Sequence, residues 1–561
     1  MLSLGSLCRI KPQRLTWGGL GGWHMWSFAR WPNRLVVTRK IGAWTRIMLA
    51  RDTGGHSGES AQTTPEVLSL ALAGAAFTSF VCYFEDFVFP HTPFLPWSDA
   101  VGFLSNGTRI ASGRLPYRDY FAFLAPGTEL TYAFLVREFG ARAWIPSLMM
   151  VSLAALTVFL MTLMAGRVMR GPVIILPGLL LVGFVLPGAM DATHHWFSTV
   201  AVLAASLILL GGTTWPRIAA VGILCGIAAC YTQNKGAMAV LGFIAYLAWR
   251  KPEELTPRRD WWRKCVVLSS LAAAVFIAVN APFIEASGLH RWLYCMIVFP
   301  IRYYPTVSLN SWRVYGQCLG KLRFGMVPFL FVHATVPFVY IISLVAIHHE
   351  RKKEPGQPWD QLLLISLTGI GMFLAIAPAP SWKRLSTVSP PALILIVWFL
   401  SRPGKVRAAC RIGLGTAAVI FALAVAVRTQ TRWHAYLDLP VGRTAFDDSG
   451  RHEEYGYILG RTHPGQLVFG TPPVLFAFGV QNPAPIDVFV PAEYTRPEQV
   501  SATIQSLQRY RVPMLVLNRQ MYVQFSALSP SDHLDPLRAY LRENYRMTKS
   551  FQTEDELWER Y

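Results

Sequence analysis

The sequence predicts a mostly α-helical fold, a polytopic bundle of about eleven transmembrane helices with a small α/β domain after it. Of the 561 residues, 53% are hydrophobic and 15% are charged, whereas about 25% of residues are charged in soluble domains. Apolar segments long enough to cross about 30 Å of hydrocarbon recur from residue 66 to residue 428. Beyond residue 428 the chain becomes polar, and short β-rich runs flank a helical pattern at 497–510.

Three regions follow from this composition. Residues 1–60 are basic, rich in tryptophan and without the apolar region of a secretory signal, so we expect a cytoplasmic tail there. Residues 61–428 hold the spans, and residues 429–561 form the expected α/β domain. The candidate strands of that domain are 465–470, 485–490 and 512–518. The expected spans lie near residues 66–84, 143–165, 172–189, 196–211, 217–231, 236–249, 265–283, 327–347, 360–378, 388–401 and 412–428.

The basic charge predicts a membrane orientation. A formal net charge of +20 would suggest nucleic-acid binding in a soluble protein, but the Lys and Arg residues of membrane proteins collect in cytoplasmic loops. With the N-terminus inside, the basic clusters at 250–264, 351–353 and 402–411 all fall on the cytoplasmic side. We therefore expect a multi-pass plasma (bacterial inner) membrane protein that binds no nucleic acid. An odd number of spans puts the connector 85–142 and the C-terminal domain together on the outer, periplasmic face.

This orientation requires that residues 125–140 do not cross the membrane. The segment begins its helical pattern after Pro126 and carries Glu129, Arg137 and Glu138, which suits a helix that lies along the outer surface. If the segment crossed, every later loop would change sides and the basic clusters would face outward. We therefore expect a surface helix.

Two carboxylates of the outer connector are candidates for catalysis. Asp99 opens a helix-like run, and Asp119 follows twenty residues later in an Arg-Asp-Tyr turn. A carboxylate is a usual general base where a hydroxyl must attack an electrophilic carbon. Each residue also has a structural alternative, a helix N-cap for Asp99 and a turn residue for Asp119.

A second polar group follows the third expected span. Asp191, His194 and His195 stand in the sequence Asp-Ala-Thr-His-His. They could ligate a divalent metal, form a solvated turn or bind substrate, and we favour substrate binding for Asp191. The C-terminal region lacks dinucleotide, P-loop and zinc motifs, so we predict no cofactor.

Basic residues on the predicted outer face need a separate explanation. Lys235 ends up at the outer surface, and Lys383 and Arg384 lie on the same side. The positive-inside rule disfavours these positions, and a phosphate on a lipid substrate would account for them. The alternative is that they reach toward ordinary lipid headgroups.

The chain also resembles a known family. The sequence Gly-x-Leu-Pro-Tyr-x-Asp-Tyr from Gly113 to Tyr120, and a Pro-Gly helix that ends in Phe139 and Gly140, follow an acidic residue after the first span. Over roughly residues 66–400 this order is similar to the GT-C membrane glycosyltransferases, in particular the protein mannosyltransferase-like and aminoarabinose transferase-like branches.

The resemblance implies roles for individual residues. It implies a polyprenyl-phosphate sugar donor, with Asp99 as the catalytic base and Asp119 in support of it. Lys235, Lys383 and Arg384 would then hold the donor phosphate. The residues that would bind substrate are Asp191, His194, Tyr117 and Arg118.

The sequence thus predicts an inverting hexosyl- or pentosyltransferase that acts on a lipid, glycan or protein acceptor at the outer face. One alternative is a lipid or solute transporter, which would show a polar path through the bundle. Another is a scaffold without activity, whose C-terminal domain binds a periplasmic partner. An outer groove that gathers Asp99, Asp119, Asp191 and Lys235 would favour the enzyme.

Overall fold

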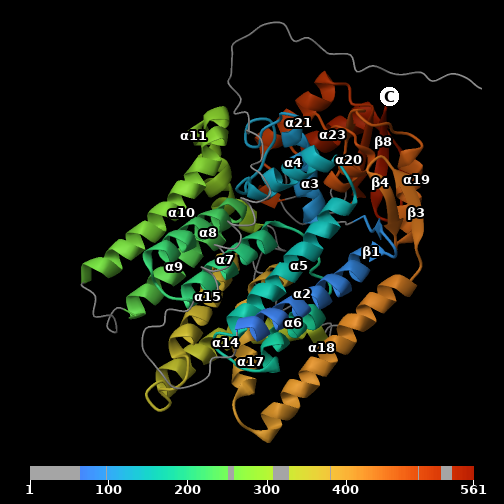
Figure 1. Ribbon diagram of the computed structural model, residues 1–561. Coiled ribbons are helices and arrows are strands. Elements are labelled where there is room, and N and C mark those ends of the chain that lie inside the picture. The colour runs from blue at the N-terminus through green and yellow to red at the C-terminus, as the bar shows by residue number, and fades with distance from the viewer. Residues whose placement is uncertain are drawn as a thin grey trace, which may run out of the picture. The chain divides into compact units, whose positions relative to one another are not determined.

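The computed structural model (Figure 1) describes residues 64–95, 98–250, 258–306, 327–378, 381–490, 492–519 and 533–561. The expected tryptophan-rich tail, residues 1–60, lies outside these residues. The described chain consists of a bundle of apolar helices and a set of strands and helices near the C-terminus, which gather at one end of the bundle (Figure 1).

Every apolar segment that the sequence marks as a span is helical. In the described part of the chain, five helices are long and apolar enough to cross a membrane, and five shorter apolar helices accompany them. The number of membrane crossings therefore stays a prediction. The bundle helices are α2 (Thr64–Asp86), α5 (Trp144–Ala165), α6 (Leu176–Phe184), α7 (His194–Leu210), α8 (Trp215–Tyr231), α9 (Gln233–Arg250), α10 (Arg258–Ser287), α14 (Val327–Glu350), α15 (Trp359–Ile376), α17 (Pro390–Ser401) and α18 (Lys405–Thr431).

Small residues let the bundle helices approach one another closely. A Cβ atom at Gly183 of α6 would lie 2.4 Å from the carbonyl oxygen of Ala418 in α18. A Cβ atom at Gly236 of α9 would lie 2.5 Å from the Cβ of Ala229 in α8. Helix association in lipid depends on this kind of close packing, because the lipid tails remove the hydrophobic drive. The helices share one large apolar core.

The connector after α2 folds into two helices that pack on each other. A short hairpin of β1 (Phe87–Val88) and β2 (Thr92–Pro93) precedes α3 (Asp99–Ala111), and α4 (Gly127–Phe139) follows Pro126, as the sequence predicts. At the crossing of α3 and α4, a Cβ atom on Gly107 would lie 2.8 Å from the Cβ of Tyr132. Whether α4 lies along the membrane surface stays a prediction.

Short helical segments bring further residues to the outer end of the bundle. After α10 the chain forms α11 (Leu289–Leu293), a π-helical turn (Tyr294–Val298), α12 (Phe299–Arg302) and the 3-10 turn Tyr304–Thr306. Between α15 and α17, the helix α16 (Trp382–Val388) starts at the N-cap Ser381, whose hydroxyl accepts a hydrogen bond from the backbone of Arg384 at 3.4 Å.

The C-terminal residues contain both strands and helices, as the sequence predicts. A four-stranded sheet has the order β5-β6-β8-β7, with β5 parallel to β6 and the other pairs antiparallel; β3 and β4 form a separate hairpin. The elements are β3 (Ala435–Leu439), β4 (Gly442–Phe446), α19 (Ser449–Leu459), β5 (Val468–Phe469), α20 (Pro472–Phe478), the 3-10 turn η6 (Ala492–Tyr494), α21 (Pro497–Arg509), β6 (Met514–Asn518), α23 (Asp535–Asn544), β7 (Tyr545–Ser550) and β8 (Asp555–Arg560).

One predicted strand is wrong. Residues 485–490 (Pro-Ile-Asp-Val-Phe-Val) form no strand, although their alternation favours one. The segment instead runs beside the connector 85–142, where the Pro485 carbonyl oxygen accepts a hydrogen bond from the Phe121 backbone at 2.8 Å. Side chains of α3 and α4 share an apolar cluster with α19, α20 and β6. The C-terminal elements therefore cover the two outer helices, while the boundary at residue 429 stays a prediction.

Candidate active site

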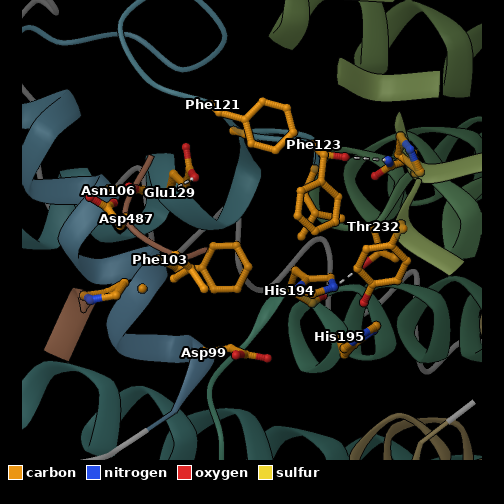
Figure 2. Close-up of a pocket in the computed structure, with 18 of the residues that line it drawn as sticks. Asp99, Phe103, Asn106, Phe121, Phe123, Glu129, His194, His195, Thr232 and Asp487 are labelled. Carbon is orange, nitrogen blue, oxygen red and sulfur yellow. Dashed lines mark hydrogen bonds between the residues drawn. The ribbon is translucent and has the colours of Figure 1, made fainter. Parts of the chain in front are cut away.

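A cavity of about 590 Å³ lies where the outer helices meet the C-terminal elements (Figure 2). Its wall combines residues of α3 and α4, the first turns of α7 and α9, α16, and the C-terminal segment 471–499. Its volume falls in the range of about 300–1,000 Å³ that is usual for ligand sites. The candidate residues of the sequence analysis that line it are Asp99, His194, His195 and Arg384.

Asp99 is the first residue of α3, and its carboxyl opens into the cavity. The protein atoms around the cavity reduce its solvation, and this effect, with the nearby charge of Asp191, raises the pKa of Asp99. The positive charges of Lys383 and Arg384 oppose the increase in part. The carboxylate therefore lies within electrostatic range of an acid and two cations.

Asp191 holds the start of α3 in place. The residue is buried, and its Oδ1 accepts a hydrogen bond from the backbone N–H of Ala100 at 3.1 Å. The first N–H groups of a helix have no partner within the helix, so this carboxylate caps α3 from a distant segment. Its Oδ2 lies 3.2 Å from the Nζ of Lys383. Asp191 thus links the first turn of α3, which carries Asp99, to the ammonium of Lys383, and it does not itself line the cavity.

The cationic side of the site comes from α16. The guanidinium of Arg384 donates a hydrogen bond to the hydroxyl of Tyr304 and lies 5.4 Å from the centre of its ring. Lys383 keeps 51% of its side chain exposed while it contacts Asp191. Arginine and lysine in this setting suit an anionic group such as a phosphate.

The two histidines at the start of α7 also line the cavity (Figure 2). The ring centres of His194 and His195 are 3.9 Å apart, and the Phe103 ring lies 5.3 Å from His194. The Nδ1 atoms of both histidines are buried without a hydrogen-bond partner. Among the described residues, no three His, Cys, Asp or Glu side chains are placed to hold one metal ion.

Three residues of the Gly113–Tyr120 motif lie outside the cavity wall. Asp119 accepts a hydrogen bond from the Leu115 backbone at 2.7 Å and forms an exposed ion pair with Arg118 at 2.8 Å. The hydrogen bond from Arg118 is the main reason that the pKa of Asp119 is lowered. Tyr117 is fully buried with φ 66°, and its hydroxyl donates to the Leu124 carbonyl oxygen at 2.6 Å. These contacts stabilise the turn, as the structural alternative for Asp119 anticipates.

Lys235 is also turned away from the cavity. Its ammonium is fully buried, and its hydrogen bonds run to the carbonyl oxygen of His195 at 2.9 Å and to the hydroxyls of Thr199 and Thr387 at 3.0 Å each. An ammonium group has three donors, so these neutral oxygens occupy all of them. In this structure Lys235 joins α9 to α7 and α16 and does not present a proton to a ligand.

A group of polar residues that the sequence analysis did not select lines the other end of the cavity. Glu129 is 5% exposed; its Oε1 accepts from the Asn106 amide at 2.8 Å and its Oε2 from the Tyr120 hydroxyl at 2.9 Å. Burial raises the pKa of Glu129 to about 7, and these two hydrogen bonds limit the increase. The charge on α4 had suggested a solvated surface, whereas the Glu129 side chain faces the cavity.

Asp487 completes this group from the C-terminal segment. Arg109 of α3 donates two hydrogen bonds to the Asp487 carboxylate, at 2.5 and 2.7 Å, and a further amide donor comes from Asn482 at 2.5 Å. The side chains of the pair are 9% and 11% exposed. No local signal in the sequence could have found Asp487, because its partner lies 378 residues away.

Comparisons with known proteins test the fold. No protein-family model matches the sequence, and no curated protein matches it. The structure is similar to that of ArnT from Cupriavidus metallidurans bound to undecaprenyl phosphate, with a TM-score of 0.54 and 13% identity over 88% of this chain and 98% of that chain. The apo state of the same protein gives a TM-score of 0.54 and 12% identity over 87% and 97%.

A shorter alignment reaches the protein O-mannosyltransferase Pmt1-Pmt2 complex of S. cerevisiae bound to the sugar donor, with a TM-score of 0.33 and 15% identity over 44% of this chain and 36% of that chain. The structures of ArnT, an aminoarabinose transferase, match 88% and 87% of this chain. The resemblance seen in the sequence is therefore confirmed for the fold, and this chain has the fold of ArnT.

Proposed function

We propose that this protein is a membrane glycosyltransferase that moves a hexose or pentose from a polyprenyl-phosphate donor to a lipid, glycan or protein acceptor. The observation that carries the proposal is the cavity in which the open carboxylate of Asp99 lies within range of Lys383 and Arg384. The GT-C fold supports it, because ArnT with the same fold binds undecaprenyl phosphate.

In the proposed reaction, a hydroxyl of the acceptor attacks the anomeric carbon of the donor sugar. The Asp99 carboxylate accepts the hydroxyl proton as the new C–O bond forms. The bond between the anomeric carbon and the phosphate oxygen breaks, and the electron pair leaves with the lipid phosphate. A single displacement of this kind inverts the configuration at the anomeric carbon.

Two positive groups stabilise the departing phosphate. Arginine recognises phosphate oxygens through its planar guanidinium, and Arg384 lines the cavity, while Lys383 adds a point charge. These charges assist the reaction because they are in place before negative charge develops on the leaving oxygen. Asp191 acts as a positioning residue, since it caps the helix that carries Asp99 and holds Lys383. No step is assigned to a metal or to another cofactor.

The proposed location is the plasma (inner) membrane, with a cytoplasmic N-terminus and the cavity on the outer, periplasmic face. The basic clusters at 250–264, 351–353 and 402–411 support this orientation. Cysteine labelling of an exposed position in α23 and of one in the connector 351–358, in intact cells and in lysed cells, measures it. Labelling of the α23 position by an impermeant reagent in lysed cells alone would contradict the orientation.

The test of the function uses membranes incubated with a polyprenyl-phosphate donor that carries a radiolabelled sugar. We expect transfer of the label to a product with inverted anomeric configuration. The variant Asp99→Asn should abolish transfer, and Glu138→Gln, which alters an exposed carboxylate of α4, should not. Movement of intact labelled lipid across the membrane without transfer would instead identify a transporter.

A further inference from the structure

The cavity has a second polar end that the proposed phosphate and proton chemistry does not use. Glu129 and Asn106 form this end with Asp487, while Asp99 lies at the bottom of the view in Figure 2. In Figure 2 the Phe103 ring lies between these three residues and His194. We call the residues Asn106, Glu129 and Asp487 the distal group.

The distal group is rich in hydrogen-bond acceptors. Arg109 commits two N–H groups to Asp487, and the oxygens of Glu129 are contacted by neutral donors, an amide and a phenol. A carboxylate offers about four lone-pair sites, and the structure shows one hydrogen bond on each Glu129 oxygen. Acceptor sites therefore remain beside the cavity.

Buried polar atoms elsewhere on the cavity wall also have no partner. The Oε1 of Gln233 is buried and makes no hydrogen bond, and its amide orientation is set by a bond from Nε2 to the Phe123 carbonyl oxygen at 3.3 Å. His194, of which 9% is exposed, has an Nδ1 without a partner. Buried polar atoms are nearly always paired, so unpaired ones in a cavity indicate a ligand that supplies the missing contacts.

The chemistry of the wall restricts the ligand class. A ligand that satisfies several neighbouring acceptors must carry several donors, and an anionic group such as a phosphate, which is rich in acceptors, does not meet this requirement. Aromatic rings at Phe103, Phe121 and Phe123 offer apolar faces between these polar groups. A sugar ring combines both features, because its hydroxyls donate hydrogen bonds and its C–H faces are apolar.

We propose that the distal group binds the hydroxyls of a sugar ring, with Glu129 and Asn106 as the specificity-determining contacts. The inference rests on the proposed function, because it assigns to that reaction one of its two sugar-bearing substrates. The ring belongs either to the donor or to a glycan acceptor. Glu129 recognises it by accepting hydrogen bonds, and an analogue without these hydroxyls leaves the buried carboxylate unpaired and binds poorly.

The experiment measures equilibrium binding of labelled probes to the full-length protein in lipid nanodiscs. The donor arm compares undecaprenyl-phosphate mannose with undecaprenyl phosphate. The acceptor arm uses methyl mannoside, methyl glucoside and methyl arabinoside on protein saturated with undecaprenyl phosphate. The variants are Glu129→Gln, Asn106→Ala and the control Glu138→Gln, whose side chain is exposed on the same helix. Asn106→Ala keeps the test valid if Glu129→Gln fails to fold.

We expect Glu129→Gln and Asn106→Ala to weaken sugar binding in one arm by about tenfold, which is the loss of one hydrogen bond to a charged group. Binding of undecaprenyl phosphate should stay unchanged, and Glu138→Gln should behave as the wild type. The inference is overturned if no sugar binds in either arm, or if both variants bind sugar normally. One outcome separates the two proposals. If the wild-type protein does not bind undecaprenyl phosphate but binds glycosides more tightly than Glu129→Gln does, the proposed function is refuted and the inference stands.

Discussion

The Arg109–Asp487 ion pair should hold the C-terminal segment against α3. The pair is bidentate and nearly buried, with side chains 9% and 11% exposed. Asp487→Asn removes one charge and leaves the Arg109 guanidinium buried without its counter-charge. Breaking a buried pair in this way costs about 3–5 kcal/mol. If the segment opens locally, its amides should exchange about 150- to 5,000-fold faster with solvent.

Hydrogen–deuterium exchange followed by mass spectrometry measures this opening. The informative amides are those of Phe121, which donates to the Pro485 carbonyl oxygen, and Ala484, which donates to Asn482. Glu453→Gln is the matched control, because it breaks an exposed pair with Lys549 whose side chains are 54% and 38% exposed. Exposed pairs contribute at most about 1 kcal/mol. Exchange in Asp487→Asn that equals exchange in this control would refute the docking role of the pair.

Three further predictions separate the roles of individual residues. Asp119→Asn should lower the thermal stability of the protein yet retain transfer activity, because Asp119 closes a turn outside the cavity. Loss of transfer activity at unchanged thermal stability would instead indicate that Asp119 has a catalytic role. Arg384→Gln should weaken binding of undecaprenyl phosphate about tenfold or more, whereas Lys235→Met should change it less than about threefold; equal losses would place the Lys235 ammonium on the phosphate. The pKa of Glu129 is raised to about 7 in the folded protein, so the contribution of Glu129 to folding stability should be greatest below about pH 4.5, fall by about 3 kcal/mol as the pH rises from about 4.5 to about 7, and stay level above that; a Glu129→Gln variant with the same pH dependence of unfolding would contradict this.

Much of the helical bundle could be predicted from the sequence because lipid strongly restricts the conformation of the backbone. A backbone in hydrocarbon must satisfy its own hydrogen bonds, so long apolar segments become helices. The start of α4 was predicted separately, from Pro126 and the helical pattern that follows it. Asp99 was selected because a carboxylate that opens a helix on an outer membrane connector usually has a function there.

Contacts between residues that are far apart in the sequence could not be predicted in this way. Asp191 caps α3 from 91 residues away, and Asp487 pairs with a residue 378 positions earlier. Glu129 suggested a solvated helix face, because sequence spacing shows charge without showing what packs against it. Residues 485–490 alternate like a strand but form none, and β8 was missed because its sequence, Asp-Glu-Leu-Trp-Glu-Arg, is mostly charged.

The role of Asp99 as the base is tested most directly by transfer from a saturating labelled polyprenyl-phosphate sugar, measured for wild-type and Asp99→Asn protein across pH. The raised pKa of Asp99 predicts that wild-type transfer is lost at acidic pH, with a midpoint above the usual aspartate value of about 3.9. The variant should bind undecaprenyl phosphate as the wild type does and transfer no sugar at any pH. Transfer by Asp99→Asn at the wild-type rate and with the wild-type pH profile would show that another group takes the proton.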